Sequence, residues 1–180
     1  KWNPAINLVA KSTLGAVWER HIADSAQLFP LIPPGARTLV DLGSGAGFPG
    51  LVLAILGVPE VHLVESDVRK ATFLREVARV TAAPATVHAV RIEQAEVPPA
   101  DVVTARALAD LADLLPWAAR ILKPTGVCLF PKGRTVGDEL TRIGDSWTMT
   151  VERFPSRIDG QSTILRLSDI APSGASLEGA

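Results

Sequence analysis

The segment Asp41-Leu42-Gly43-Ser44-Gly45-Ala46-Gly47-Phe48-Pro49-Gly50 decides the fold of this chain. It closes a short apolar run, Thr38–Leu42, and leads into Phe48–Leu56, whose apolar residues predict a helix. Three of its glycines satisfy the G-x-G-x-x-G fingerprint of nucleotide-binding strand–turn–helix units, namely Gly45, Gly47 and Gly50. Because glycine has no side chain, the backbone of such a loop can approach a ligand closely.

An acidic residue follows the next predicted strand. Glu65 ends the apolar run Val61–Glu65 and lies twenty residues after Gly45. A carboxylate at this place meets the hydroxyl groups of an adenosine ribose in nucleotide-binding folds. Asp67 lies two residues further on and competes for the same role. A tight turn without any ligand is the alternative, but three glycines with a correctly spaced acid favour ligand binding.

The charge at Asp41 separates two kinds of cofactor. A dinucleotide would place its pyrophosphate beside this carboxylate, and the like charges would repel. S-adenosylmethionine has no phosphate, and its ammonium and sulfonium groups prefer negative surroundings. Asp41 therefore favours S-adenosylmethionine over the dinucleotide of an oxidoreductase. The alternative role for Asp41 is to cap the amides of the turn, and the two roles can coexist.

Strands and helices alternate through the middle of the chain, which predicts an α/β fold with a mostly parallel, Rossmann-like sheet covered by helices on both faces. The predicted strands are Thr38–Leu42, Val61–Glu65, Thr86–Arg91, Asp101–Ala105 and Gly126–Phe130. The predicted helices are Phe48–Leu56, Val68–Thr81 and Asp110–Leu122. Trp147–Phe154 and Ser162–Leu167 alternate in the manner of antiparallel strands, so the sheet is expected to finish with a C-terminal hairpin.

The pattern divides the chain into three parts. Residues 1–34 are expected to form an N-terminal helical segment packed on the core, with a helix over Ser12–Leu28 that follows an extended stretch. Residues 35–168 form the cofactor-binding domain. Residues 169–180 are small and polar, and we expect a disordered tail. Because the chain begins with Lys1 rather than Met, we expect that its N-terminus is trimmed or only partly ordered.

Composition narrows the class of protein. The chain has 180 residues, of which 47% are hydrophobic and 21% charged, as in an ordinary globular domain. Its net charge of -1 gives no overall positive field, so any contact with RNA requires a local basic patch or an RNA that is presented by a larger particle. One cysteine, Cys128, excludes an intramolecular disulfide. Apolar runs are too short to span a membrane, and we expect no membrane contact.

At this point the residues resemble the bacterial small-subunit ribosomal RNA methyltransferase G family. The similarity lies in segments that occur in the family's order over roughly residues 1–135. They are Trp2-Asn3, Asn7-Leu8, Arg20-His21-Ile22-Ala23-Asp24-Ser25, the glycine loop with its Phe48-Pro49-Gly50 ending, Arg91-Ile92-Glu93, Ala105-Arg106-Ala107 and Lys132-Gly133. The loop alone is evidence of the fold, whereas the whole set is specific to the family.

The resemblance implies a class I methyltransferase with S-adenosylmethionine as methyl donor. It also implies methylation at N7 of one guanine in 16S ribosomal RNA, free or within the small ribosomal subunit, in the cytoplasm. No protein partner is inferred. By position, the family's cofactor residues fall on Gly43, Phe48, Ile92, Glu93 and Arg106. Asp41, Gly45, Gly47 and Glu65 join this set from the physical argument above.

Several of these residues have a second interpretation. Ile92 and Glu93 suit the edge of an adenine pocket, or Ile92 belongs to the core and Glu93 begins a helix. Arg106 ends the fourth strand, where its guanidinium can bind the cofactor carboxylate or an RNA phosphate. Its alternative is an ion pair with Asp110 or Asp113.

Three further groups of polar residues are candidates for the site. His21 and Asp24 share a helix face and form either a network at the cofactor end of the domain or part of a solvated surface. Lys132 and Arg134 follow the fifth strand and are candidates to hold phosphates. We expect the solvent-exposed face of a helix to be formed by Arg69, Lys70 and Arg75. The histidines are scattered, so we expect no metal site.

The implied chemistry needs no general base. Guanine N7 carries a lone pair and no proton, so catalysis would come from positioning, to which Arg106 and Lys132 are expected to contribute. Phe48, Trp2 and Trp18 are the aromatic candidates to stack on the target base. Two other functions stay open at this stage: a nucleotide-dependent oxidoreductase and a non-catalytic RNA-binding module on the same fold.

Overall fold

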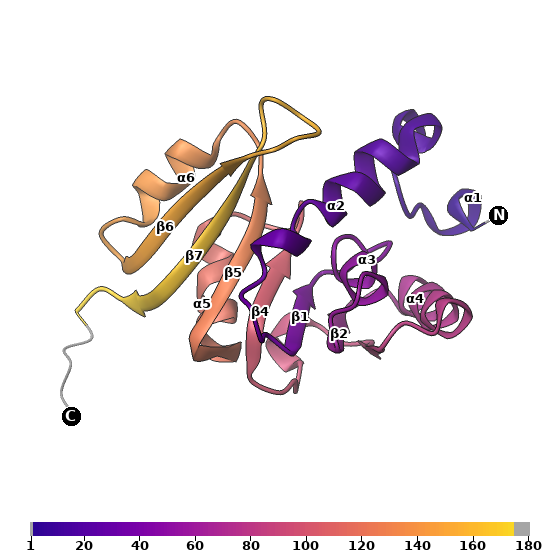
Figure 1. The fold of residues 1–180 in the computed structure, drawn as a ribbon, viewed down its shortest axis with the longest axis horizontal. Coiled ribbons are helices and arrows are strands. Elements are labelled where there is room, and N and C mark those ends of the chain that lie inside the picture. Colours follow the sequence, from indigo (N-terminus) through magenta and orange to yellow (C-terminus); the bar gives the residue numbers. More distant parts are fainter. Residues whose placement is uncertain (1, 175–180) are drawn as a thin grey trace.

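A computed structural model, which describes residues 2–174, contains one seven-stranded sheet in the order β3-β2-β1-β4-β5-β7-β6 (Figure 1). The first five strands are parallel to one another, and β7 runs antiparallel to both β5 and β6. The strands are β1 (Thr38–Leu42), β2 (Glu60–Val64), β3 (Ala85–His88), β4 (Ala100–Ala105), β5 (Leu122–Lys132), β6 (Trp147–Pro155) and β7 (Thr163–Pro172).

Helices cover both faces of this sheet and bury a separate apolar cluster on each. On one face lie α3 (Gly50–Ile55) and α4 (Val68–Thr81), which contribute Leu51, Leu53 and Leu74 to the core. On the other lie α5 (Leu111–Ile121) and α6 (Val136–Ile143), which contribute Leu114, Leu115 and Ile143. Strand β1 is buried along its whole length between the two clusters, as expected of a central parallel strand.

The predicted fold class is confirmed, including the mostly parallel sheet and the antiparallel hairpin at its edge. Helix α4 has the predicted bounds, Val68–Thr81. Two differences concern the second half of the chain. Helix α6 was not predicted, and strand β5 extends from Leu122 to Lys132 rather than from Gly126 to Phe130. The expectation of a tail from residue 169 is wrong for its first residues, because β7 continues to Pro172. Residues 175–180 lie outside the described part.

The N-terminal segment is helical but irregular. A short helix, α1 (Asn3–Ile6), occupies the stretch predicted to be extended. The predicted helix Ser12–Leu28 is divided into a 3₁₀ helix (Lys11–Ala16), a π-helical stretch (Trp18–Ala23) and one turn of α-helix, α2 (Asp24–Ala26). Gly15 lies inside the 3₁₀ part, and an interior glycine lowers α-helical stability by about 1 kcal/mol relative to alanine. This segment lies across the end of the sheet near β1 and α3 in Figure 1.

Among residues 2–174, no helix combines the length and the apolar character that crossing a membrane requires.

Candidate functional site

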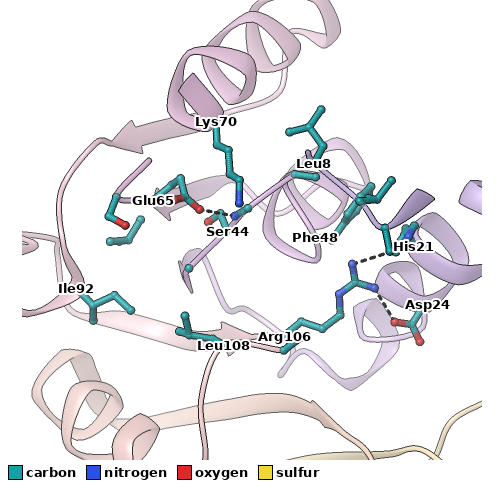
Figure 2. A pocket seen from close by; sticks show the side chains of 18 of the residues that line it. Leu8, His21, Asp24, Ser44, Phe48, Glu65, Lys70, Ile92, Arg106 and Leu108 are labelled. Carbon is teal, nitrogen blue, oxygen red and sulfur yellow. Dashed lines mark hydrogen bonds and ion pairs between the residues drawn. The ribbon is translucent and has the colours of Figure 1, made fainter. Parts of the chain in front are cut away.

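A cavity of about 730 Å³ opens at the carboxyl ends of β1, β2 and β4, beneath the N-terminal segment (Figure 2). The glycine loop forms one wall. The residues after β3 and β4 form a second wall, and the N-terminal residues Leu8, Val9 and Ala10 form a third. Ligands of open α/β sheets bind outside the carboxyl ends of the strands, so the cavity occupies the expected place.

The glycines of the loop have two different tasks. Gly43 and Gly45 line the cavity with φ of +65° and +55°, in the left-handed region that favours glycine. A Cβ at Gly45 would meet only the Gly43 carbonyl oxygen, 3.8 Å away, so this backbone faces open space. Gly47, by contrast, does not line the cavity, and a Cβ there would lie 2.8 Å from Leu51 Cβ. The structure therefore places Gly47 in helix packing rather than at the cofactor.

Asp41 also lies outside the cavity. Its side chain is fully buried, and its carboxylate accepts hydrogen bonds from Thr104 Oγ1 at 2.7 Å and from the Gly50 amide at 3.2 Å. Burial raises the pKa of this carboxyl group to about 6, although these hydrogen bonds act in the opposite direction. The arrangement matches the alternative interpretation, in which Asp41 caps the turn. Asp41 thus shapes the loop from behind, with no direct path to a ligand.

Glu65 lies at the cavity wall and supports the loop from the other side. Its Oε2 accepts the Gly45 amide at 2.8 Å and its Oε1 accepts the Asp67 amide at 2.7 Å. A carboxylate has about four acceptor positions, so two remain for a ligand. Asp67 does not line the cavity. It caps α4 through the amides of Arg69 and Lys70, and its bonds to Arg69 lower the pKa of the Asp67 carboxyl group to about 2.

The wall opposite Glu65 is apolar. Ile92 and Leu108 face the cavity in Figure 2, and Val64, Val90 and Trp117 add to the same lining. Ile92 is 8% exposed and belongs to the core, which confirms its core interpretation, and it also lines the cavity, so its contact with an adenine ring stays a prediction. Glu93 lies beside it at the exposed rim, where Arg120 holds the turn by donating to the carbonyls of Ile92 and Glu93. An apolar wall across the cavity from Glu65 suits an adenine ring attached to a ribose.

Arg106 follows β4 and connects the sheet to the N-terminal segment. Its Nη1 lies 2.9 Å from Asp24 Oδ2, and its Nη2 lies 3.1 Å from His21 Nδ1 (Figure 2). The guanidinium carbon is 5.1 Å from the centre of the Phe48 ring, which stacks on His21. The predicted polar network of His21 and Asp24 is confirmed. The alternative pairing with Asp110 or Asp113 is wrong, because Asp110 pairs with Arg142.

The hydrogen bonds of His21 define its tautomer. Arg106 can only donate, so Nδ1 of His21 accepts. Thr13 donates its hydroxyl to the Ala10 carbonyl at 2.8 Å, and therefore accepts from Nε2 of His21 at 2.9 Å. Burial, with Arg106 next in importance, lowers the pKa of His21. A neutral His21 thus connects the cavity-lining residue Ala10 to Arg106.

Sequence reasoning missed part of this site. Leu8, Val9 and Ala10 line the cavity, and Asn3 holds Val9 in place through its side-chain amide at 2.8 and 3.2 Å. Lys70 was expected on the solvent-exposed face of a helix, but it also lines the cavity beside Glu65 (Figure 2). Its position in the first turn after Glu65 was the available signal. The N-terminal residues offered no such signal apart from the family resemblance at Asn7-Leu8.

A second cavity of about 420 Å³ adjoins the first. The two share Asp24, Arg106, Ala107, Leu108 and Ser162 as lining residues, so Arg106 belongs to the wall between them. The second cavity continues to the residues that follow β5. A ligand in one cavity is therefore close to a ligand in the other.

Lys132 lines this second cavity but is already paired. Its ammonium lies 2.8 Å from Glu139 Oε2 and donates to the Ala109 carbonyl at 2.8 Å, with side chains 9% and 6% exposed. A buried ammonium requires such a counterion, so the expectation that Lys132 is free to hold a phosphate is wrong. Lys132 instead fixes α6 against the loop that follows β4.

Comparison with known proteins agrees with this geometry. The family described as GidB, rRNA small subunit methyltransferase G, matches residues 1–163. The ribosomal RNA small subunit methyltransferase G of Rhodospirillum centenum is 78% identical over 174 residues, covering 97% of this chain and 81% of that protein. The protein of the same name from Paramagnetospirillum magneticum is 58% identical, covering 95% and 83%.

Among solved structures, the ribosomal protein L11 methylase of Lactobacillus delbrueckii superposes with a TM-score of 0.65 at 18% identity, covering 81% of this chain and 76% of that one. This likeness shows the class I methyltransferase fold. With the match over residues 1–163 and the two close relatives, it leads to one conclusion: the chain belongs to the rRNA small subunit methyltransferase G family.

Proposed function

We propose that this chain transfers a methyl group from S-adenosylmethionine to N7 of a guanine in 16S ribosomal RNA. Family membership supports ribosomal RNA as the substrate and a methyl group as the cargo. The observation that carries the proposal is the pair of cavities with Arg106 in their common wall, because methyl transfer needs donor and acceptor side by side.

The larger cavity fits the donor. The bare backbone at Gly45 admits a ligand closely, and Glu65 keeps two acceptor positions for ribose hydroxyls. Ile92 and the apolar residues around it take the adenine ring. Asp24 and Arg106 border the amino-acid end with charges of both signs, and Glu93 lies beside Ile92 at the adenine end. When bound, S-adenosylmethionine supplies an electrophilic methyl group on a sulfonium.

The smaller cavity receives the target base. Guanine N7 attacks through a lone pair in the ring plane, so no side chain has to remove a proton. The methylated ring carries a positive charge, and the carboxylates of Asp24, Asp110 and Glu139 line this cavity. Each of the three is paired with a basic side chain, Arg106, Arg142 and Lys132 respectively, so the lining of this cavity is close to electroneutral. Arg106, held by Asp24 and His21, is a positioning residue that keeps the common wall in place.

The place of action follows from the substrate. We assign the reaction to the cytoplasm, where the target guanine is presented either by free 16S RNA or by an assembled small subunit. The oxidoreductase interpretation receives no support from the family, and Asp41 does not separate the two cofactors directly because it lies behind the loop. A binding module without catalysis has the same fold, and only an activity measurement distinguishes it from an enzyme.

The decisive experiment incubates the full chain with methyl-labelled S-adenosylmethionine and small ribosomal subunits that lack the modification. We expect label in 16S RNA, recovered as 7-methylguanine after digestion. Free 16S RNA serves as the second substrate form. Label on another atom would overturn the N7 target, and absence of label with both substrate forms would overturn the activity.

A matched pair of glycine variants tests the donor cavity. Gly45→Val places a branched side chain toward the cavity and should abolish binding of S-adenosylhomocysteine in calorimetry while the domain still folds. Gly57→Val is the control, since Gly57 also has a positive φ, +117°, and open space around its Cβ, yet lies outside the cavity. Equal affinities in the two folded variants would contradict the assignment.

A further inference from the structure

Three exposed arginines line the two cavities or lie next in sequence to residues that do, although they come from distant parts of the chain. Arg20 belongs to the N-terminal segment and lines the larger cavity. Arg134 follows Gly133, which lines the smaller cavity. Arg157 precedes Ile158 and Asp159, which line the larger one. We call these three residues the arginine rim.

Contacts between the three segments hold the rim together. Gln27 lies one turn after the helical stretch that contains Arg20. Its side chain accepts a hydrogen bond from the Arg157 amide at 2.9 Å and donates one to Ser156 Oγ at 3.2 Å. The loop between β6 and β7 is thereby fixed beside the N-terminal segment. Hydrogen bonds from Gln161 and Ser162 lower the pKa of Asp159, and the nearby positive charges of Arg20 and Arg134 act in the same direction. Both guanidinium groups therefore lie close to one cavity-lining carboxylate.

The positive charges of the arginine rim are not used in ion pairs within the described residues. Within residues 2–174, none of its three guanidinium groups has a carboxylate oxygen within 4.0 Å. The other exposed arginines include several that are paired, such as Arg69 with Asp67 and Arg79 with Glu76. In a chain with a net charge of -1, such a cluster at a site entrance is a local basic patch.

An exposed aromatic residue accompanies the rim. Trp18 is 78% exposed and lies two residues before Arg20 in the same π-helical stretch. Tryptophan is seldom left so open to water without a partner. Residues two apart on a helix do not face each other, so Trp18 extends the exposed surface of this stretch beyond Arg20, and its ring offers a stacking surface for an unpaired base.

We infer that the arginine rim and Trp18 form the surface on which the RNA flanking the target guanine docks, with Arg20, Arg134 and Arg157 at phosphates and Trp18 against a base. The inference rests on the proposed RNA substrate and adds the face that binds it. Its geometry is consistent with the two cavities, because RNA held across both openings brings a base to the smaller one.

The test measures binding of a labelled 16S RNA transcript by the full chain at several salt concentrations. We expect Arg134→Ala/Arg157→Ala to weaken binding roughly 4- to 25-fold, since an exposed charge contact contributes about two- to fivefold. The slope of log affinity against log salt should become less steep by about 0.7–0.9 for each lost phosphate contact. Affinity for S-adenosylhomocysteine should not change, because neither side chain lines the donor cavity.

Arg37→Glu is the charge-matched control. It changes the net charge by the same two units as the double variant. Arg37 is exposed and lies just before β1, at the amino end of the strand, whereas the cavities lie at the carboxyl ends. Trp18→Ala should weaken RNA binding at least about fivefold, with Trp18→Phe restoring most of it. A double arginine variant whose affinity and salt slope equal those of Arg37→Glu would overturn the docking surface.

The outcome for the wild-type chain separates this inference from the proposed function. Tight, rim-dependent RNA binding without methyl transfer would support the docking surface and overturn the activity. Methyl transfer with RNA binding that ignores the rim would support the activity and overturn the docking surface. A wild-type chain that binds neither the transcript nor small ribosomal subunits would overturn both.

Discussion

The glycine loop and the N-terminal segment line the same cavity but are held in place by different forces. The loop is fixed from behind by buried contacts: Asp41 with Thr104 and the Gly50 amide, and the Ser44 amide with the Val64 carbonyl. The middle of the N-terminal segment is held over the cavity by polar contacts at Arg106, with side chains of Arg106 and Asp24 each 18% exposed, whereas its ends are anchored by the buried Leu28 and by Trp2 against Phe73. Its own helix is irregular, and Leu14 and Trp18 are exposed.

This difference shows that one wall of the site is part of the core while another is attached to it. A buried wall is lost only with the global fold, whereas a wall held by a few polar contacts can open separately. We therefore expect variants of the loop to change the stability of the whole domain. Variants of the Arg106 network should instead change ligand binding and local protection.

The largest effect is expected for Gly50→Ala. A Cβ at Gly50 would lie 2.5 Å from Asp41 Cβ and 2.6 Å from Leu63 Cδ2, both on central strands that cannot move away. Overpacking of this kind destabilises by about 1–3 kcal/mol, and the rigid surroundings favour the upper end. Urea unfolding measures the loss. Gly137→Ala in α6 is the control, since its Cβ meets nothing within 4 Å, and it should leave stability unchanged or slightly higher.

Arg106→Ala should have the second largest effect, and on a different quantity. Loss of its charged hydrogen bonds to Asp24 and His21 should weaken S-adenosylhomocysteine binding or turnover by about 1.5–3 kcal/mol. The free energy of global unfolding should change less than this. Limited proteolysis should cut residues 8–24 faster than in the wild type. A variant with full turnover and an unchanged cleavage pattern would make Arg106 dispensable, and Arg106 would not hold this wall.

The smallest effect concerns pH. The pKa of His21 is lowered in the folded protein, so the neutral form is favoured there. The contribution of His21 to holding the N-terminal segment over the cavity is then fully present above its ordinary pKa of 6.5. This contribution is lost as pH falls below that value. Affinity for S-adenosylhomocysteine should drop by a few-fold between pH 7.5 and 5.5.

His21→Gln separates this effect from other titrations, because glutamine can accept and donate hydrogen bonds but does not titrate in this range. Its affinity should vary less with pH than that of the wild type. His88, whose pKa is also lowered by burial, lies on β3 outside the cavity, so His88→Gln should keep the wild-type dependence. Identical pH profiles for the wild type and His21→Gln would exclude His21 as the titrating group.

The same contrast explains what the sequence could predict. Strands, the loop and the acid Glu65 follow from periodicity and spacing, which are local properties of a buried wall. The role of Asp41 depends on Thr104, which is 63 positions away, and the role of Lys132 depends on Glu139 in α6, a helix that the sequence did not predict. Both charged side chains can be buried because each has a hydrogen-bonding partner in the interior.

The N-terminal wall was predicted least well. Its helical character was expected, but Lys11–Ala16 and Trp18–Ala23 depart from the α-helix in opposite directions, one tighter and one wider. Such departures arise when tertiary contacts override a weak intrinsic preference, and here Thr13, His21 and Asp24 are all engaged by the network around Arg106. The extent of β5 and the existence of α6 were missed because Pro124, Gly126 and Gly137 weaken the local signals.

The strand order has a consequence for how the protein is made. Strand β1 is completed by β4, and the bond between Asp41 and Thr104 joins residues 63 positions apart. The cavity also uses residues from Leu8 to Ser162. A ribosome adds about 5–20 residues per second, so seconds pass between synthesis of the glycine loop and of its last neighbours. During that interval the nascent chain has the loop without the cavity, and the cofactor can bind only when synthesis of the domain is nearly finished.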